Sequence, residues 1–220
     1  AGRGRAARQW HAPYGTAILA GFILKPPLAP LDPAQIPLIA GIAVARALVE
    51  TEAALAGSVW LKWPNDALLG PDPVTAGKVA GILAEAVFTD GSLDHAVLGV
   101  GINANQTQDE LPTVDDVAVP PISLRQFLGR PVDRTALLAA LCRSLAAQLS
   151  PLRLPEDILA DWRALLAHLG RPVIVRPHTG AEEIPGIAVD VTLSGDLVLQ
   201  DPCGRRRLFT AADISLRPAP

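Results

Sequence analysis

Residues 78–103 read KVAGILAEAVFTDGSLDHAVLGVGIN, and this stretch decides the fold class. Two apolar runs of strand length, at residues 78–88 and 94–103, flank Thr89-Asp90-Gly91-Ser92. The composition of that linker is typical of a hairpin turn. The stretch therefore predicts an antiparallel meander, in which two neighbouring strands are joined by a hairpin turn.

Strands and helices are also predicted on both sides of this hairpin. Before it, the sequence predicts a strand at 17–24, a helix at 34–51 and a strand at 58–63. After it, a polar, Pro-rich loop at 106–121 precedes helices at 123–128, at 134–149 with Asp133 as cap, and at 156–169. The first part of the chain should thus combine helices with an antiparallel sheet.

The pattern changes at Gly170-Arg171-Pro172, where short strands replace helices. Strands are expected at 173–176, 184–191, 197–200 and 206–210, separated by turns, which together indicate a small β-barrel. We therefore expect two domains, residues 1–169 and 170–220. Arg205-Arg206-Arg207 is expected to be a solvated edge that discourages strand pairing, with contact to phosphates or to an acidic partner as the alternative.

Composition narrows the functional classes. The chain has 220 residues, 50% hydrophobic, and a net charge of -3, which argues against nucleic-acid binding through bulk phosphate neutralisation. Its longest apolar stretch, residues 36–49, is interrupted by Gly41 and Arg46 and is too short to cross a bilayer. Cys142 and Cys203 lie far apart without a CxxC pair, so a reducing compartment, the cytoplasm, is expected.

Lys62-Trp63-Pro64-Asn65-Asp66 places a cation, an aromatic ring, a strand stop and two polar side chains in five residues. Pro64 ends the strand and leaves Asn65 and Asp66 at a turn, where they could orient donors or hold Mg²⁺ with its water shell. The alternative is an Asx turn that caps the strand, with Trp63 in the core.

Gly2-Arg3-Gly4-Arg5, followed by Arg8, forms a second motif at the start of the chain. Glycines allow backbone N–H groups to approach a ligand closely, and arginine presents paired donors that match phosphate oxygens. The motif therefore indicates a phosphate-binding loop, with a flexible basic terminus as the alternative.

Lys78 stands where an apolar strand begins, and Gly81 leaves room beside it for a ligand. Such an ammonium could steady a carboxylate and an α-phosphate together, although an ordinary solvated lysine is the alternative. Gly99 and Gly101 alternate in the second strand and suit a flat floor under a ligand, with Asn103 as a polar contact at its end. The third glycine and the following helix of a dinucleotide fingerprint are missing.

These motifs occur in a characteristic order: GRGRxxRxW from residue 2, KWPND from 62, KxxGIL from 78 and GxGxN from 99. In this order they resemble the bacterial biotin-[acetyl-CoA-carboxylase] ligases, and the similarity continues to Asp213-Ile214-Ser215-Leu216-Arg217. The resemblance implies an α/β (α+β) catalytic domain, like those of class II aminoacyl-tRNA synthetases, followed by an SH3-like barrel. Fold alone would not fix the substrate.

The resemblance also implies a reaction. The carboxylate of biotin would attack the α-phosphorus of Mg-ATP, and a lysine of the biotin carboxyl carrier protein would then attack the resulting biotinyl-5'-AMP. Lys78 and Arg5 would be catalytic. Biotin would be bound by Gly2, Arg3, Gly4, Trp10, Lys78, Gly81, Gly99 and Gly101. The nucleotide would be bound by Arg5, Arg8, Lys62, Asn65, Asp66 and Asn103, with Mg²⁺ near Asp66 and no other metal.

The chain departs from the family pattern at a few positions. Ala6-Ala7 stands where the family often has Arg-Gly, Gly77 where it often has Arg, and the loop at 70–77 is longer than usual. These changes affect the expected retention of the adenylate. The family's Ser-Thr-Asn segment and the Gln before the glycine-arginine loop are not in residues 1–220, so the catalytic domain is expected to be incomplete at its N-terminus.

Several alternatives stay open. A lipoate or octanoate ligase has the same fold, although KWPND and the loop with Trp10 favour biotin. Some members of the family carry an N-terminal helix-turn-helix and regulate DNA binding through the adenylate, so DNA would be a partner only with such a domain. A weakly active or inert module is a third alternative. A homodimer through the central sheet is a further family-level expectation.

Overall fold

The predicted hairpin forms the middle of a five-stranded antiparallel sheet, in the order β3-β7-β6-β5-β4. The computed structural model describes residues 2–4, 9–25, 33–112, 119–150, 152–177, 182–210 and 214–218. The strands of this sheet are β3 (Ala17–Leu24), β4 (Val59–Lys62), β5 (Asp66–Leu69), β6 (Gly77–Thr89) and β7 (Ser92–Asn103). The predicted antiparallel meander is confirmed, and the structure places it in the middle of the sheet.

The two faces of this sheet differ because side chains alternate along each strand. On β7, Ala96, Leu98 and Ile102 are buried in the main core, whereas Leu19 and Ile23 of β3 point to the other side and are exposed. We call this other side the open face. It carries Leu19, Gly21, Ile23, Gly81, Leu83, Val97, Gly99 and Gly101.

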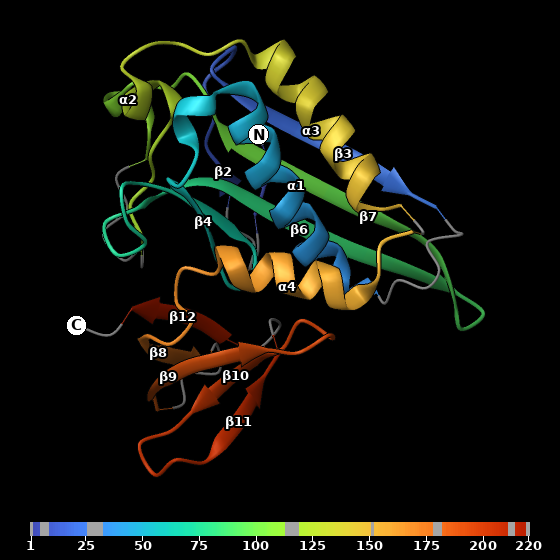
Figure 1. Cartoon of the computed structure of the whole chain (residues 1–220). Coiled ribbons are helices and arrows are strands. Elements are labelled where there is room, and N and C mark those ends of the chain that lie inside the picture. Colours follow the sequence, from blue (N-terminus) through green and yellow to red (C-terminus); the bar gives the residue numbers. More distant parts are fainter. Residues whose placement is uncertain are drawn as a thin grey trace.

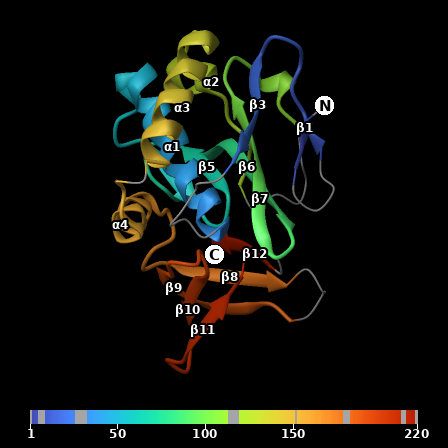
Figure 2. The ribbon, with the colours of Figure 1, turned by 90° about the vertical axis from the view of Figure 1, so that its right-hand side faces the viewer.

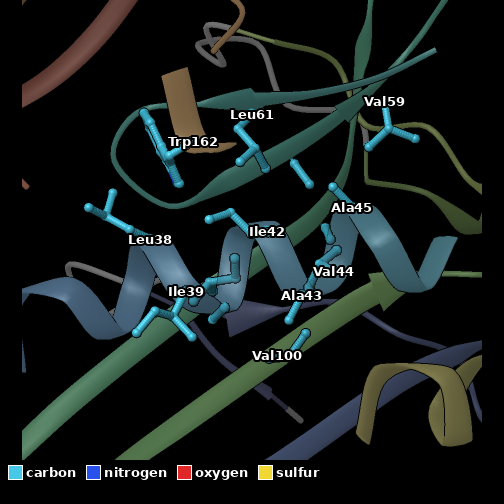
Figure 3. Packing of buried hydrophobic residues seen from close by; sticks show 14 of the residues in the cluster. Leu38, Ile39, Ile42, Ala43, Val44, Ala45, Val59, Leu61, Val100 and Trp162 are labelled. Carbon is cyan, nitrogen blue, oxygen red and sulfur yellow. The ribbon is translucent and has the colours of Figure 1, made fainter. Parts of the chain in front are cut away.

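Helices cover the core face, as Figures 1 and 2 show. The helix predicted at 34–51 is present as a 3-10 turn, η1 (Pro33–Gln35), and α1 (Ile36–Thr51), whose Ile39, Ile42 and Ala43 pack against the sheet (Figure 3). The remaining helical elements are η2 (Ala53–Leu55), η3 (Gln108–Glu110), α2 (Leu124–Leu128), α3 (Arg134–Gln148) and α4 (Pro155–Leu165). Asp133 caps α3 as predicted, accepting from the backbone N–H groups of Thr135 and Ala136.

The last helix of this domain ends earlier than the sequence pattern predicts. The predicted helix at 156–169 stops at Leu165, and the chain then runs parallel to the edge strand β4. Leu166 bridges Leu61, and the N–H of Ala167 donates to the carbonyl of Leu61 at 2.8 Å. The apolar side chains of residues 165–167 suit a helix and a buried strand equally, so pairing with the exposed edge of β4 decides the outcome.

Near the N-terminus, two very short strands lie on the opposite side from the helices (Figure 2). β1 (Gly2–Arg3) and β2 (Gln9–Trp10) pair with each other, with Gly2 opposite Trp10. Arg5 and Arg8 lie outside the described residues, as do the side chain of Arg3 and the departures Ala6 and Ala7. This strand pair brings Trp10 over the open face.

The C-terminal part is a second antiparallel sheet, in the order β11-β10-β9-β8-β12, below the first in Figure 1. Its strands are β8 (Pro172–Pro177), β9 (Ile184–Val191), β10 (Leu197–Gln200), β11 (Arg206–Phe209) and β12 (Ile214–Pro218). β11 and β12 lie at the two ends of this order, and in the described part of the chain no pairing between them closes the sheet into the expected barrel. Arg206 and Arg207 are exposed on the edge strand β11, which confirms the solvated edge.

His168 lies where the two sheets meet and is buried, with 4% of its surface exposed. Burial, together with the charges of Lys62 and Arg171, lowers its pKa from an ordinary value of 6.5 to about 4. The imidazole is therefore neutral in the folded protein at neutral pH. Among the described residues, its Nε2 has no hydrogen-bond partner.

The depressed pKa of His168 predicts acid sensitivity. Between pH 6.5 and 4 the unfolded chain binds a proton at this residue and the folded chain does not. The free energy of unfolding should therefore fall as pH falls through this window, by up to about 3 kcal/mol from this group alone. Urea titrations of wild type and His168→Gln should show a shallower loss in the variant. The exposed His11→Gln should behave as wild type, and parallel profiles for wild type and His168→Gln would contradict the assignment.

Candidate functional site

A single row of paired residues crosses the open face. Strand register places Leu19 opposite Gly101, Gly101 opposite Gly81, Gly81 opposite Asp66, and Asp66 opposite Lys62. We call these five residues the cross-sheet row. It brings the KWPND, KxxGIL and GxGxN motifs together although they are far apart in the sequence.

A register shift in β6 brings Lys78 to the same face. Strict alternation would orient Lys78 like Ala80, towards the helices, but the β5–β6 pairing shifts between Ala67 and Leu68. As a result Val79 is buried in the main core. A Cβ added to Gly81 would lie 3.4 Å from the Lys78 Nζ, so the lysine reaches the open face beside the row.

Lys78 and Asp66 form the charged centre of this site. The Lys78 Nζ lies 2.6 Å from Asp66 Oδ1, and both side chains are partly exposed. The same Nζ lies 5.6 Å from the centroid of the Trp10 ring. An ammonium between a carboxylate and an aromatic face is fixed in position yet open to solvent, which suits it to meet an incoming anion. Lys78 is therefore more than an ordinary solvated lysine.

Trp10 lies directly on the glycines of the row. A Cβ on Gly81 would stand 2.6 Å from Trp10 Cζ3, and a Cβ on Gly101 would stand 2.8 Å from Trp10 Cε2. Both separations are too short for any larger residue. The sequence predicted a flat floor from Gly99 and Gly101 and room for a ligand beside Gly81; in the structure the indole ring of Trp10 lies on Gly81 and Gly101. Gly99 has no atom nearer than 3.7 Å to such a Cβ and is not covered in this way.

The turn that ends at Asp66 is held at both ends. Trp63 is 0% exposed, as expected for a core residue. The Asn65 side chain donates through Nδ2 to the carbonyl of Ile82 at 2.6 Å, and the backbone carbonyl of Asn65 accepts from the N–H of Ile82 at 2.9 Å. Asn65 thus extends the β5–β6 ladder, and Asp66 begins β5 as a strand residue.

Asn103 is buried and braces the segment beside Lys78. Its Nδ2 donates to the carbonyls of Lys78 at 3.3 Å and Ile122 at 3.2 Å, and its Oδ1 accepts from Gln106 at 3.0 Å. Lys78 in turn pairs with Pro120 and Ile122 through its backbone, at 2.7 and 3.0 Å. Sequence reasoning missed Gln106 and residues 120–122, because only this long-range pairing brings them to the site.

Metal binding has one candidate in this arrangement, the Asp66 carboxylate. Among the described residues, no group of three or more His, Cys, Asp or Glu side chains is placed to hold a metal ion. Mg²⁺ in nucleotide sites is commonly held by one or two carboxylates together with phosphate oxygens and water. Asp66 fits that donor set, so the site suits a metal that arrives with a nucleotide.

Comparison with known proteins supports this reading of the motifs. Residues 1–103 match the biotin/lipoate A/B protein ligase family, and residues 168–217 match the biotin protein ligase C-terminal domain. The biotin--[acetyl-CoA-carboxylase] ligase of Paracoccus denitrificans is 35% identical over 97% of this chain and 85% of its own length. The chain belongs to the biotin protein ligase family.

Further relatives agree with this assignment. A bifunctional ligase/repressor from Escherichia coli K12 is 31% identical over 100% of this chain and 64% of its own length. A biotin protein ligase from Aquifex aeolicus, solved in complex with biotin and ATP, superposes with a TM-score of 0.76 at 25% identity. It covers 99% of this chain and 84% of the solved one. The fold predicted from the resemblance to biotin protein ligases is thereby confirmed.

The expected ligase site residues divide into three groups. Trp10, Lys78, Gly81, Gly101, Asp66 and Lys62 lie together on or beside the cross-sheet row, with Gly2 behind Trp10. Asn65 and Asn103 use their side-chain amides to hold backbone, so contact with a nucleotide stays a prediction for both. The same holds for Gly4 and Gly99, while Arg5, Arg8 and the side chain of Arg3 lie outside the described residues.

The contact between Trp10 and Gly101 can be tested directly. Gly101→Ala should displace the Trp10 ring, because the new Cβ would lie 2.8 Å from it. The indole N–H resonance of Trp10, assigned with Trp10→Phe, should shift strongly in the NMR spectrum of Gly101→Ala. Gly99→Ala is the matched control, since its Cβ meets nothing closer than 3.7 Å and should leave that resonance in place. Equal shifts in both variants would refute the stacking.

Among the described residues, no helix has the length and apolar character needed to span a bilayer.

Proposed function

We propose that this protein activates biotin with Mg-ATP to form biotinyl-5'-AMP and transfers the biotin to a lysine of the biotin carboxyl carrier protein of acetyl-CoA carboxylase. The observation that carries this proposal is the Lys78 ammonium, held at 2.6 Å from Asp66 beside the Trp10 ring. It belongs to a chain that is 35% identical to a named biotin--[acetyl-CoA-carboxylase] ligase.

In the first step a carboxylate oxygen of biotin forms a bond to the α-phosphorus, and the bond to the pyrophosphate oxygen breaks. Two anionic groups must approach each other, and negative charge builds on the phosphoryl oxygens. Lys78 would offset that charge from a fixed position, because Asp66 orients its ammonium before the reactants arrive. Trp10 would present its free ring face to biotin, with its other face on the glycines.

In the second step the amine of the carrier lysine attacks the biotin carbonyl carbon, AMP leaves, and the nitrogen loses a proton. Lys78 would again stabilise the developing oxyanion and the departing phosphate. Asp66 would hold Mg²⁺ on the nucleotide side, where the metal supplies charge neutralisation for the phosphates. Lys62 lies beside Asp66 in the row and would add positive charge there.

Biotin-dependent release of pyrophosphate from Mg-ATP tests the proposal. The assay should show release with biotin and none with lipoate at the same concentration, since lipoate ligases share the first matched family. Transfer is then measured as biotin attached to the carrier protein. Release with lipoate alone would favour the lipoate ligase alternative, and silence with both acids would contradict a ligase function.

The bifunctional ligase/repressor relatives are longer than this chain. The chain spans 63–64% of the length of the bifunctional ligase/repressor relatives, so their repressor activity is not part of this proposal. Cytoplasmic location and a homodimer stay predictions from the sequence.

Removing the central ammonium should abolish adenylate formation. Lys78→Ala should lower the rate of biotin-dependent pyrophosphate release by about 10²–10³-fold, the usual loss when one preorganised charge is removed from a transition state. Lys25→Ala is the matched control, because Lys25 is exposed just after the end of β3. An unchanged rate in Lys78→Ala would exclude the proposed role.

Arg5 should retain the adenylate, as the resemblance implies for the glycine-arginine loop. Arg5→Ala should release biotinyl-5'-AMP faster than wild type, because one paired phosphate donor is lost. Retention is measured as adenylate that remains bound after gel filtration. Arg206→Ala, on the edge strand β11 of the second sheet, should retain it normally. If Arg5→Ala retains the adenylate as well as wild type does, Arg5 has no such role.

A further inference from the structure

The indole of Trp63 ties the catalytic sheet to the small C-terminal domain. Its Nε1–H donates to the carbonyl of Gly195, in the turn between β9 and β10, at 2.8 Å. Trp63 is 0% exposed, so this N–H would be costly to bury without an acceptor. A phenyl or aliphatic side chain would fill the same core without that requirement. Packing alone therefore does not explain why a tryptophan with this hydrogen bond stands at residue 63.

The acceptor is held firmly in place. Gly195 has a φ of +81°, which glycine adopts without strain, and the turn is closed by hydrogen bonds from Thr192 N–H to Asp196 and from Gly195 N–H to Thr192. Gln35, the last residue of η1 and the N-cap of α1, donates to the carbonyl of Leu193 at 3.1 Å. The Gly195 carbonyl is thus presented to Trp63 by a preformed turn.

A second contact fixes how this turn sits on the catalytic domain. Arg163 of α4 makes two hydrogen bonds to the carboxylate of Asp190, at 2.6 and 2.9 Å, and one to the carbonyl of Val191 at 3.3 Å. Paired contacts of this kind define an orientation as well as a distance. These contacts hold the β9–β10 turn in a defined position between the start of α1, α4 and Trp63.

On its other side, Trp63 begins the short turn that leads to the charged centre. Asn65 is fixed to Ile82, and Asp66 is 2.6 Å from the Lys78 ammonium. The turn is thus held at two points: the indole of Trp63 binds the small domain, and Asn65 binds Ile82 of β6. A shift of Trp63 would therefore be passed to Asp66 through two intervening residues.

We propose that Trp63 is a positioning residue. Through its hydrogen bond to Gly195, the position of the small domain on the first sheet determines the geometry of the Asp66–Lys78 pair. Its effect on activity rests on the proposed function, because that pair is placed there in the adenylation step. Loss of the hydrogen bond should lower kcat while the Michaelis constant for biotin stays near its wild-type value. The reason is that Trp10 and Gly101 belong to β2 and β7, which do not include this turn.

The first test compares two buried tryptophans. Trp63→Phe should lower kcat for biotin-dependent pyrophosphate release by about tenfold, a loss of the size expected for a displacement below 1 Å. Trp162→Phe is the matched control. Trp162 is 1% exposed, and among the described residues its indole N–H has no hydrogen-bond partner. It should lose stability from the same change in volume and keep its kcat. Equal losses of kcat in the two variants would overturn the proposal.

A double-mutant cycle then asks whether Trp63 acts through Asp66. In an Asp66→Asn background, Trp63→Phe should cause little further loss, because the carboxylate that it positions is already gone. Full additivity of the two losses would show that Trp63 acts elsewhere. Gly195→Ala reaches the same contact from the acceptor side, since the new Cβ would lie 3.2 Å from the Ala34 carbonyl. It should reproduce the effect of Trp63→Phe.

A measurement without substrates separates this inference from the proposed function. Hydrogen exchange should become faster together in peptides covering residues 62–69 and 192–196 in Trp63→Phe and Gly195→Ala, and not in Trp162→Phe. Unchanged exchange at 62–69 would overturn the coupling. If the wild-type protein releases no pyrophosphate while the Trp63→Phe and Gly195→Ala variants show this linked exchange, the proposed ligase function is contradicted and the coupling is still supported.

Discussion

The pairing of β6 with β7 places opposite requirements on the two faces of one ladder. Towards the helices, residues such as Leu98, Ile102 and Ile82 are buried, and each such side chain contributes about 1.5–3 kcal/mol by leaving water. Towards the open face, the same ladder places Gly81 opposite Gly101, where a side chain would collide with Trp10. Stability is thus concentrated on one face, and the other face is free to be shaped for a ligand.

Lys78 follows from a local break in this ladder. The register shift beside Ala67 turns Val79 into the core and Lys78 to the open face, where Asp66 meets it. A partly exposed ion pair contributes little to stability. Its value here lies in orientation, because a fixed ammonium needs no rearrangement when charge develops nearby. The deviation from a regular strand is therefore what gives the site its central cation.

Much of this arrangement could be predicted from local sequence. Two apolar runs and the Asp90-Gly91 turn predict the hairpin, and the four motifs contain Trp10, Asp66, Lys78, Gly81 and Gly101, which the structure brings together. The direction of Lys78 could not be predicted, because it depends on how β6 pairs with β5. The stacking of Trp10 on glycines and the internal role of Asn103 likewise arise from contacts between segments distant in sequence. For the same reason the predicted end of α4 was wrong, because residues 166 and 167 pair with the edge of β4 and do not continue the helix.

That captured segment also bears on protein engineering. Residues 166 and 167 belong to the first sheet by hydrogen bonding, although they follow the last helix and lead directly into the small domain. A chimera joined directly after α4 would remove residues 166 and 167 from the edge of β4, and the backbone of β4 would then be exposed to intermolecular pairing. A junction after Gly170 would keep that edge covered. The useful unit for domain exchange is therefore defined by the sheet, and the helix end that looks like a natural border is a poor place to cut.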